Sequence, residues 1–142
     1  MVCQKVIGSG LVLVLLIVAG CAKPGTDPTV KVTGTVTYKG TPVSGASVGF
    51  FPEKGRPGSG TTDAQGKFTL STFRRGDGAV PGLHKVTIAD VVETPKKGTP
   101  EAEKWQPPPP RFPAKYADAK KSGLTAEVKQ GDKNDFTFNM TD

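Results

Sequence analysis

Apolar and polar side chains alternate strictly over residues 30–39, and this alternation constrains the fold more than any other feature of the chain. Even-numbered positions hold valine, glycine or tyrosine, whereas odd-numbered positions hold lysine or threonine. Successive side chains of a β-strand point to opposite faces of a sheet. The segment is therefore predicted to be a strand with one buried face and one face in water.

Similar runs recur along the chain, separated by turn signals. The residues that share a predicted inner face are Ala46, Val48 and Phe50, then Phe68 and Leu70, then His84, Val86 and Ile88, then Leu124, Ala126 and Val128, then Phe136, Phe138 and Met140. Asp63-Ala64-Gln65-Gly66 predicts a tight hairpin turn with Gly66 at positive φ. No long amphipathic helix can be drawn. We therefore predict an all-β fold, an antiparallel β-sandwich of about seven strands.

Glycine and proline are abundant, with 18 and 13 residues, which raises the question of disorder. Their distribution argues for order, because the glycines punctuate strand-like runs while prolines crowd between Pro95 and Pro113. The sequence thus predicts a turn-rich domain with one long Pro-rich loop.

The start of the chain carries a basic residue, Lys5, then an apolar run over residues 6–18, and then Val18-Ala19-Gly20-Cys21. This ending resembles a bacterial lipobox, at which a precursor is lipidated on cysteine and cut just before it. The resemblance implies a signal peptide at 1–20, lipid on Cys21 and a lipidated tether at 21–29. Two alternatives are an ordinary secretory signal and a transmembrane anchor, although a span needs about 20 apolar residues.

Removal of the signal peptide would take Cys3 with it and leave Cys21 as the one cysteine. No disulfide could then form within the mature chain, so packing would stabilise the fold. The mature chain would carry eighteen basic and thirteen acidic side chains, a charge of +5. This charge is mild and spread along the sequence, which argues against nucleic acid as a partner.

Three segments resemble the carboxypeptidase regulatory-like domains, small sandwiches of transthyretin (prealbumin)-like topology: VTGTVTYKGTPVSGASVGFFP, GTTDAQGKFTL and DGAVPGLHKVTI. The later segment RFPAKYADAKKSGLTAEVKQGDKNDFTFNM resembles the C-terminal part of short lipoproteins from planctomycete-like bacteria. Together they cover about residues 30–140, so the domain is predicted at 30–142. The resemblance implies an exported, often surface-associated module without catalytic machinery.

Residues that could carry chemistry are sparse. His84, the single histidine, is a candidate metal ligand or base, but a metal site usually needs three or more protein ligands, and the favoured interpretation is a ring packed in the core. Asp63, Asp77 and Asp118 stand beside turn-forming residues, without the spacing of a calcium loop. The chain is similar to the transthyretin-like hydroxyisourate hydrolases in fold only. We predict no enzyme activity, no cofactor and no metal.

The segment at 94–122 is the remaining candidate for function. It holds seven basic against three acidic residues, together with Trp105, the single tryptophan, followed by Pro107–Pro110. A polyproline stretch is stiff and extended, and a tryptophan beside it suits contact with a protein or a sugar. Trp105 and Arg111 are the predicted contact residues. The alternative is a spacer loop whose aromatic residues Trp105, Phe112 and Tyr116 cover an open edge of the sandwich.

The sequence thus predicts a lipoprotein held in a membrane on its non-cytoplasmic side, in the outer membrane or at the cell surface. Its predicted function is that of a non-catalytic binding or assembly module of the cell envelope, with an envelope protein or a polysaccharide as partner. The alternatives are a purely structural envelope component and, less favoured, a hydrolase of unrecognised type.

Overall fold

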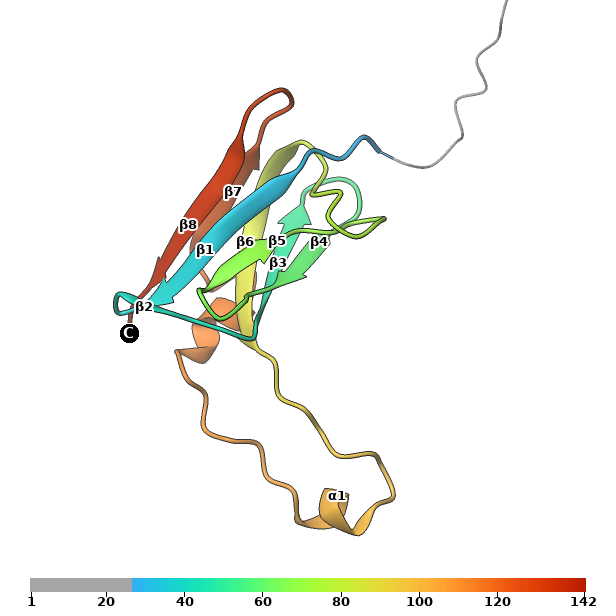
Figure 1. Cartoon of the computed structure of the whole chain (residues 1–142), viewed down its shortest axis with the longest axis vertical. Coiled ribbons are helices and arrows are strands. Elements are labelled where there is room, and N and C mark those ends of the chain that lie inside the picture. The colour runs from blue at the N-terminus through green and yellow to red at the C-terminus, as the bar shows by residue number, and fades with distance from the viewer. Residues whose placement is uncertain (1–26) are drawn as a thin grey trace, which may run out of the picture.

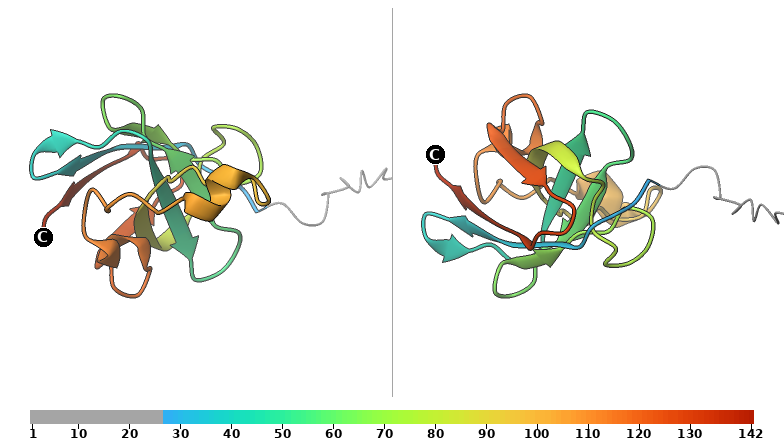
Figure 2. Two further views of the ribbon diagram at one scale, coloured as in Figure 1. Left: turned by 90° about the horizontal axis from the view of Figure 1, so that it is seen from below. Right: turned by 90° about the horizontal axis from the view of Figure 1, so that it is seen from above.

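The computed structural model describes residues 27–142, and these form two four-stranded sheets packed face to face (Figures 1 and 2). The predicted signal peptide, Cys21 and most of the predicted tether lie outside the described residues. The elements are β1 (Val32–Tyr38), β2 (Thr41–Pro42), β3 (Ala46–Pro52), β4 (Gly58–Thr61), β5 (Lys67–Thr69), β6 (Gly82–Asp90), α1 (Pro100–Lys104), the 3₁₀ helix η1 (Ala114–Ala117), β7 (Leu124–Val128) and β8 (Asn134–Met140).

Strand β1 lies at the centre of the first sheet. Strand β8 pairs with it over its full length, from Val32 opposite Asn134 to Tyr38 opposite Met140. Because β8 occupies one edge of β1, the short strands β2 and β5 share the other edge. The second sheet has the order β4-β3-β6-β7 and is antiparallel throughout.

The prediction of a wholly antiparallel sandwich is wrong at β1 and β8, which run parallel. An alternating pattern reports which face of a strand is buried, and it is the same for either direction of the neighbouring strand. Strand β7 belongs to the second sheet and β8 to the first, so the chain crosses between the sheets after β7. It then enters the first sheet in the same direction as β1.

The core confirms the predicted inner faces. Phe50 lies at its centre, with the ring centroids of Phe68, His84, Phe136 and Phe138 between 5.6 and 6.2 Å from its own. Aromatic rings at such separations stabilise a core beyond the burial of their area. The predicted inner residues Val32, Val36, Ala46, Val48, Leu70, Val86, Ile88, Ala126, Val128 and Met140 are also buried.

The first residues of the domain are held against the loop before β6. The Val30 N–H donates to the Ala79 carbonyl at 2.8 Å, and the Ala79 N–H donates back to Val30 at 3.0 Å. This close approach requires glycine at position 78, which has a φ of +92° and whose absent Cβ would lie 1.7 Å from the Val30 carbonyl oxygen. The entry of the chain into the sandwich is thereby fixed.

The predicted turn at Asp63–Gly66 is confirmed, with Gly66 at a φ of +74°. The Asp63 carboxylate accepts the N–H groups of Gln65 and Lys67, each at 2.9 Å. The strands that flank this turn belong to different sheets, and their segments meet in a single bridge between Ser59 and Ser71. The turn therefore links the two sheets along one side of the sandwich.

Candidate functional site

A long excursion leaves the sandwich between β6 and η1, and residues 91–113 are called the arm below. The arm projects from one end of the sandwich and carries the short helix α1 at its tip (Figure 1). The described chain begins at the opposite end of the sandwich (Figure 1). The predicted Pro-rich loop is therefore a protruding structure rather than a cover over a sheet edge.

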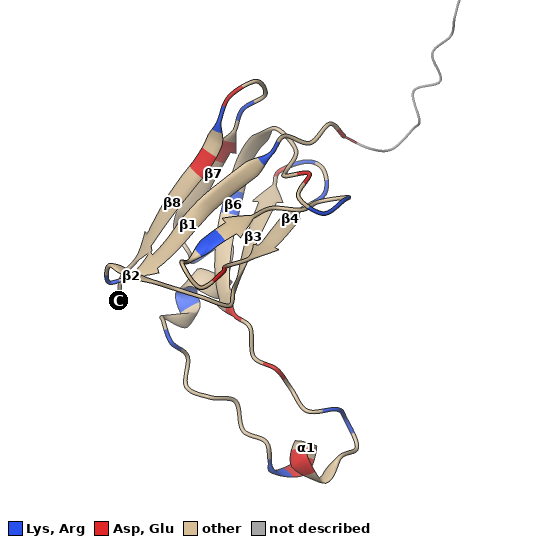
Figure 3. Ribbon diagram, viewed as in Figure 1, with Lys and Arg blue, Asp and Glu red and all other residues tan. Residues whose placement is uncertain are grey.

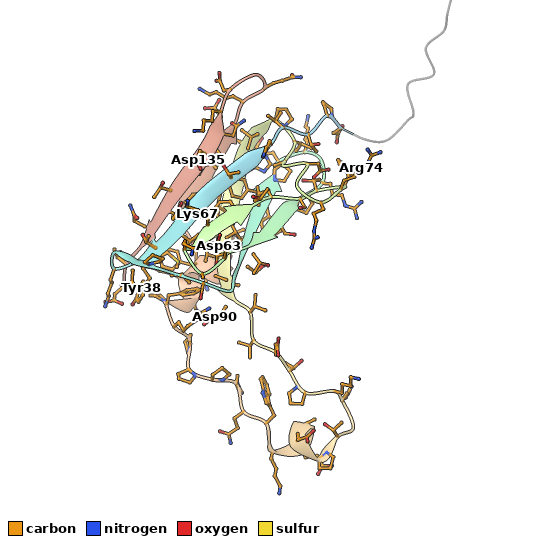
Figure 4. All side chains as sticks on the ribbon, viewed as in Figure 1. Tyr38, Asp63, Lys67, Arg74, Asp90 and Asp135 are labelled. Carbon is orange, nitrogen blue, oxygen red and sulfur yellow. The ribbon has the colours of Figure 1, made fainter. Side chains whose placement is uncertain are left out.

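Arg111 closes the base of the arm. Its Nε donates to Asp90 Oδ1 at 2.7 Å, its Nη2 forms an ion pair with the same carboxylate, and its backbone N–H donates to Asp90 Oδ2 at 3.2 Å. Its Nη1 donates to the Ser44 carbonyl at 2.8 Å. Because Asp90 is the last residue of β6, where Figure 4 labels it, these contacts join the outgoing and returning segments of the arm.

The same contacts shift the pKa values of both side chains. The hydrogen bonds from Arg111 hold the pKa of Asp90 below its ordinary value, and the Asp90 carboxylate raises the pKa of Arg111. Two guanidinium nitrogens donate to Asp90 Oδ1, and hydrogen bonds between ionised groups are stronger than those between neutral groups. The structure thus gives Arg111, a predicted contact residue, an internal role in positioning the arm.

Trp105 lies on the returning segment of the arm and is half-buried. It lines a cleft of about 340 Å³ together with Val91, Val92, Pro108 and Pro109, while Asp90, Glu93 and Arg111 also line it. Val91 remains 52% exposed in this cleft. The arm therefore presents an apolar surface formed by one indole ring, two prolines and two valines.

Charge does not distinguish the arm from the rest of the surface. The arm carries Lys96, Lys97, Lys104 and Arg111 against Glu93, Glu101 and Glu103, a net charge of +1, and both signs are interspersed along it (Figure 3). The remaining basic residues of the 94–122 segment, Lys115, Lys120 and Lys121, lie in and after η1. The basic excess of the 94–122 segment is therefore divided between the arm and the residues in and after η1.

The end of the arm and the chain that follows it pack on the sandwich. Phe112 and Tyr116 are buried, as expected for the part of the segment that covers the core. The Tyr116 hydroxyl donates to the Thr141 carbonyl at 2.9 Å and accepts the Thr141 N–H at 3.0 Å. The accepted backbone N–H holds the pKa of Tyr116 below its ordinary value. Both ends of the arm are thus attached to the sandwich.

His84 points into the core, as predicted, and is fully buried. Its Nε2–H donates to the Val80 carbonyl at 2.7 Å, and its ring lies 5.6 Å from that of Phe50. Its Nδ1 has no hydrogen-bond partner among the described residues. The imidazole is enclosed by core side chains, so its role here is packing.

The three candidate carboxylates hold turns. Asp77 accepts N–H groups from Thr72, Phe73 and Arg74 at 2.7 to 3.0 Å. Burial raises the pKa of Asp77, but these N–H donors outweigh that effect and bring the pKa below its ordinary value. Asp63 and Asp118 likewise accept nearby backbone N–H groups.

Residues 27–142 contain no cluster of three or more histidine, cysteine, aspartate or glutamate side chains suited to a metal ion. None of the helices in this part of the chain is long and apolar enough to span a bilayer.

The sequence identified Trp105 and Arg111 but missed Asp90, the partner that fixes the base of the arm. Asp90 lies 21 residues before Arg111, and no local spacing links an acid at the end of one strand to a base beyond a long loop. The sequence offered one weak signal for Asp90, because it is a lone acidic residue at the end of an alternating strand, just before the Pro-rich segment.

Comparison of the chain with family models, with curated proteins and with solved structures finds no match.

Proposed function

We propose that this protein is an exported, membrane-tethered binding module that presents the arm to a protein partner of the cell envelope. The tether would be the lipid on Cys21, and the module would act without catalysis. The observation that carries the proposal is the placement of the two ends: the described chain starts at one end of the sandwich and the arm projects from the other (Figure 1). A lipid anchor before residue 27 would leave the arm on the far side from the membrane.

The composition of the arm supports a protein partner. Tryptophan is enriched among the residues that dominate binding energy at protein interfaces, and Trp105 here lies in a cleft with Pro108 and Pro109. Prolines and a closed base restrict the free arm, so less conformational entropy is lost on binding. In this scheme Trp105 is the contact residue and Arg111 is a positioning residue.

We further propose that the sandwich is transthyretin-like and belongs with the carboxypeptidase regulatory-like domains. The support is the arrangement of two four-stranded sheets together with the sequence resemblance over about residues 30–140. Such folds serve many purposes, so the proposed activity depends on the arm and not on the fold.

Site-specific photo-crosslinking in the native envelope tests the proposal. A photoreactive amino acid at Lys104, beside Trp105, is expected to give one defined adduct with an envelope protein. The same group at Leu83 is the matched control, because Leu83 is an exposed apolar residue on the sandwich itself. Adding Trp105→Ala to the Lys104 variant is expected to abolish the adduct without changing the melting temperature.

Two outcomes would contradict the proposal. Equal adducts from both positions would show that the arm is not a specific contact. A loss of melting temperature on Trp105→Ala, with no adduct from either position, would instead favour a structural envelope component in which Trp105 stabilises the arm.

A further inference from the structure

A second concave surface lies away from the arm, on the side of the sandwich where β4 meets β5. It has a volume of about 630 Å³ and is called the seam groove below. Its walls carry the hydroxyl groups of Ser47, Ser59, Thr61 and Thr69, and its charged side chains include Lys67 and Arg75. The volume lies within the usual range of about 300–1,000 Å³ for ligand sites.

Strand register explains how these hydroxyl groups come together. Ser47 lies opposite Thr61, and Ser59 lies two residues away on the same face of β4. The bridge between Ser59 and Ser71 joins this face to the segment that continues β5, which brings in Thr69. The outer faces of the two sheets are thus continuous at the groove. Hydroxyl groups can both donate and accept there.

Two cations lie at different points along these hydroxyl groups. Lys67 is the first residue of β5. Arg75 lies on the following loop, which a hydrogen bond from the Gly76 N–H to Ser71 Oγ, at 2.8 Å, holds against the groove. Lys67 and Ser71 are four residues apart, or about 13 Å along an extended chain. Figure 4 labels Lys67 near the Asp63 turn and Arg74, the neighbour of Arg75, toward the end where the described chain begins.

Neither cation is neutralised within the described residues, whose ion pairs are Lys39–Asp142, Arg111–Asp90 and Lys129–Glu127. The carboxylate of Asp63 also lines the groove, where it accepts two backbone N–H groups. Both cationic side chains are exposed. The groove therefore carries two cations and one hydrogen-bonded carboxylate, a net charge of +1, with hydroxyl groups along its walls.

We propose that the seam groove binds a segment of an acidic polysaccharide. Sugar hydroxyl groups match the serine and threonine side chains, and carboxylate groups on successive sugar units match Lys67 and Arg75. A single small anion would meet one of these cations, whereas an acidic chain meets both. The charge expected of the mature chain, +5, is mild but has the sign that attracts such a polymer. The proposal is independent of the function assigned to the arm.

Isothermal titration calorimetry on the full chain in neutral detergent micelles tests the proposal. The probe is hexagalacturonate, with the neutral maltohexaose and sodium phosphate as comparison ligands. We expect hexagalacturonate to bind, maltohexaose not to bind, and phosphate to compete only at a large molar excess. Added salt is expected to weaken binding, because exposed charges are screened.

Variants assign the binding to the groove. Lys67→Gln and Arg75→Gln are each expected to lower the affinity about two- to fivefold, and the double variant about tenfold, as expected for exposed ion pairs. Thr61→Val removes a hydroxyl group without changing charge and is expected to lower the affinity about two- to fivefold. Lys133→Gln, at the exposed turn between β7 and β8, is the matched control and should leave the affinity unchanged.

Three results would overturn the proposal. The first is no binding of hexagalacturonate by the unmodified chain. The second is binding that the double variant and Lys133→Gln reduce equally, which would indicate attraction to the overall charge alone. The third is full competition by equimolar phosphate, which would mark an anion site and not a polysaccharide groove. Melting temperatures of all variants are measured alongside.

Discussion

The ion pair at the base of the arm gives a quantitative test of how the arm is held. Arg111→Ala removes three side-chain contacts at once, two to Asp90 and one to the Ser44 carbonyl. Asp90→Ala removes the carboxylate but leaves the contact with Ser44. The two single variants and the double variant form a cycle that isolates the Asp90–Arg111 interaction.

The expected magnitude follows from exposure and geometry. Exposed ion pairs contribute about 0.2–1 kcal/mol. Here the Arg111 side chain is 48% exposed and that of Asp90 is 18% exposed, and two guanidinium nitrogens donate to one carboxylate oxygen. We therefore expect a coupling free energy of about 1 kcal/mol, at the upper end of that range. Arg111→Ala alone is expected to cost about 1–2 kcal/mol, since the Ser44 carbonyl also loses a charged donor.

The coupling is expected to depend on pH in a defined direction. The pKa of Asp90 is lowered in the folded protein, so the pair contributes fully above the carboxyl pKa of the unfolded chain, about 3.9. The contribution is lost as the pH falls through the lower pKa of the folded state. The coupling should therefore be constant between pH 5 and pH 7 and should disappear in stronger acid.

Urea unfolding measures the coupling, and hydrogen exchange measures its location. Arg111→Ala is expected to speed exchange of amides in residues 91–113 while those of β3 and β6 change little. Lys129→Ala is the matched control, since Lys129 lies 3.8 Å from Glu127 in a pair exposed on both sides, and should cost less than about 0.5 kcal/mol. A coupling below about 0.3 kcal/mol, or arm exchange equal to that of the unmodified chain, would refute the reasoning.

Three further predictions concern the rest of the chain. Gly78→Ala should lower the free energy of unfolding in urea by about 2–5 kcal/mol, because position 78 has a positive φ and the new Cβ would meet the Val30 carbonyl. The control Gly131→Ala, also at positive φ but in open space, should lower it by about 1–2 kcal/mol. Equal losses in the two variants would contradict the contact with Val30. Asp77→Asn should lower stability by about 1–2 kcal/mol at pH 7, and the difference should shrink as the pH falls through the lowered pKa of Asp77; a difference that persists in acid would speak against an ionised cap. Mass spectrometry of membrane extracts should find a species with the mass of residues 21–142 plus lipid, and Cys21→Ser should abolish it. An unchanged mass in this variant would contradict lipid attachment at Cys21.

The inner faces of the strands were predictable because burial and alternation are local properties. Phe50, Ile88 and Met140 are buried as their positions in the alternating runs indicated. The tight turn at Asp63–Gly66 was also predictable, since it depends on residues within reach of one another in the sequence. The burial of His84 was predictable as well, because His84 and Val86 are two residues apart in one strand and therefore share its inner face.

Pairings between distant segments were not predictable. The parallel partnership of β1 with β8 joins residues that are 102 positions apart, and neither strand encodes the direction of its neighbour. The partners of Arg111 and the seam groove depend equally on long-range placement. The sequence located Trp105 in a Pro-rich segment, but it did not indicate that this segment projects from the sandwich.

The parallel pair also constrains the order of events in folding. Strand β1 begins at Val32 and β8 only at Asn134, so one whole edge of β1 stays without its partner until residues 134–140 have been made. Long-range pairing of this kind slows folding. A ribosome that has not yet made β8 thus holds a domain whose first sheet cannot be completed. Removal of residues 134–140 would likewise leave one edge of β1 unpaired along its full length.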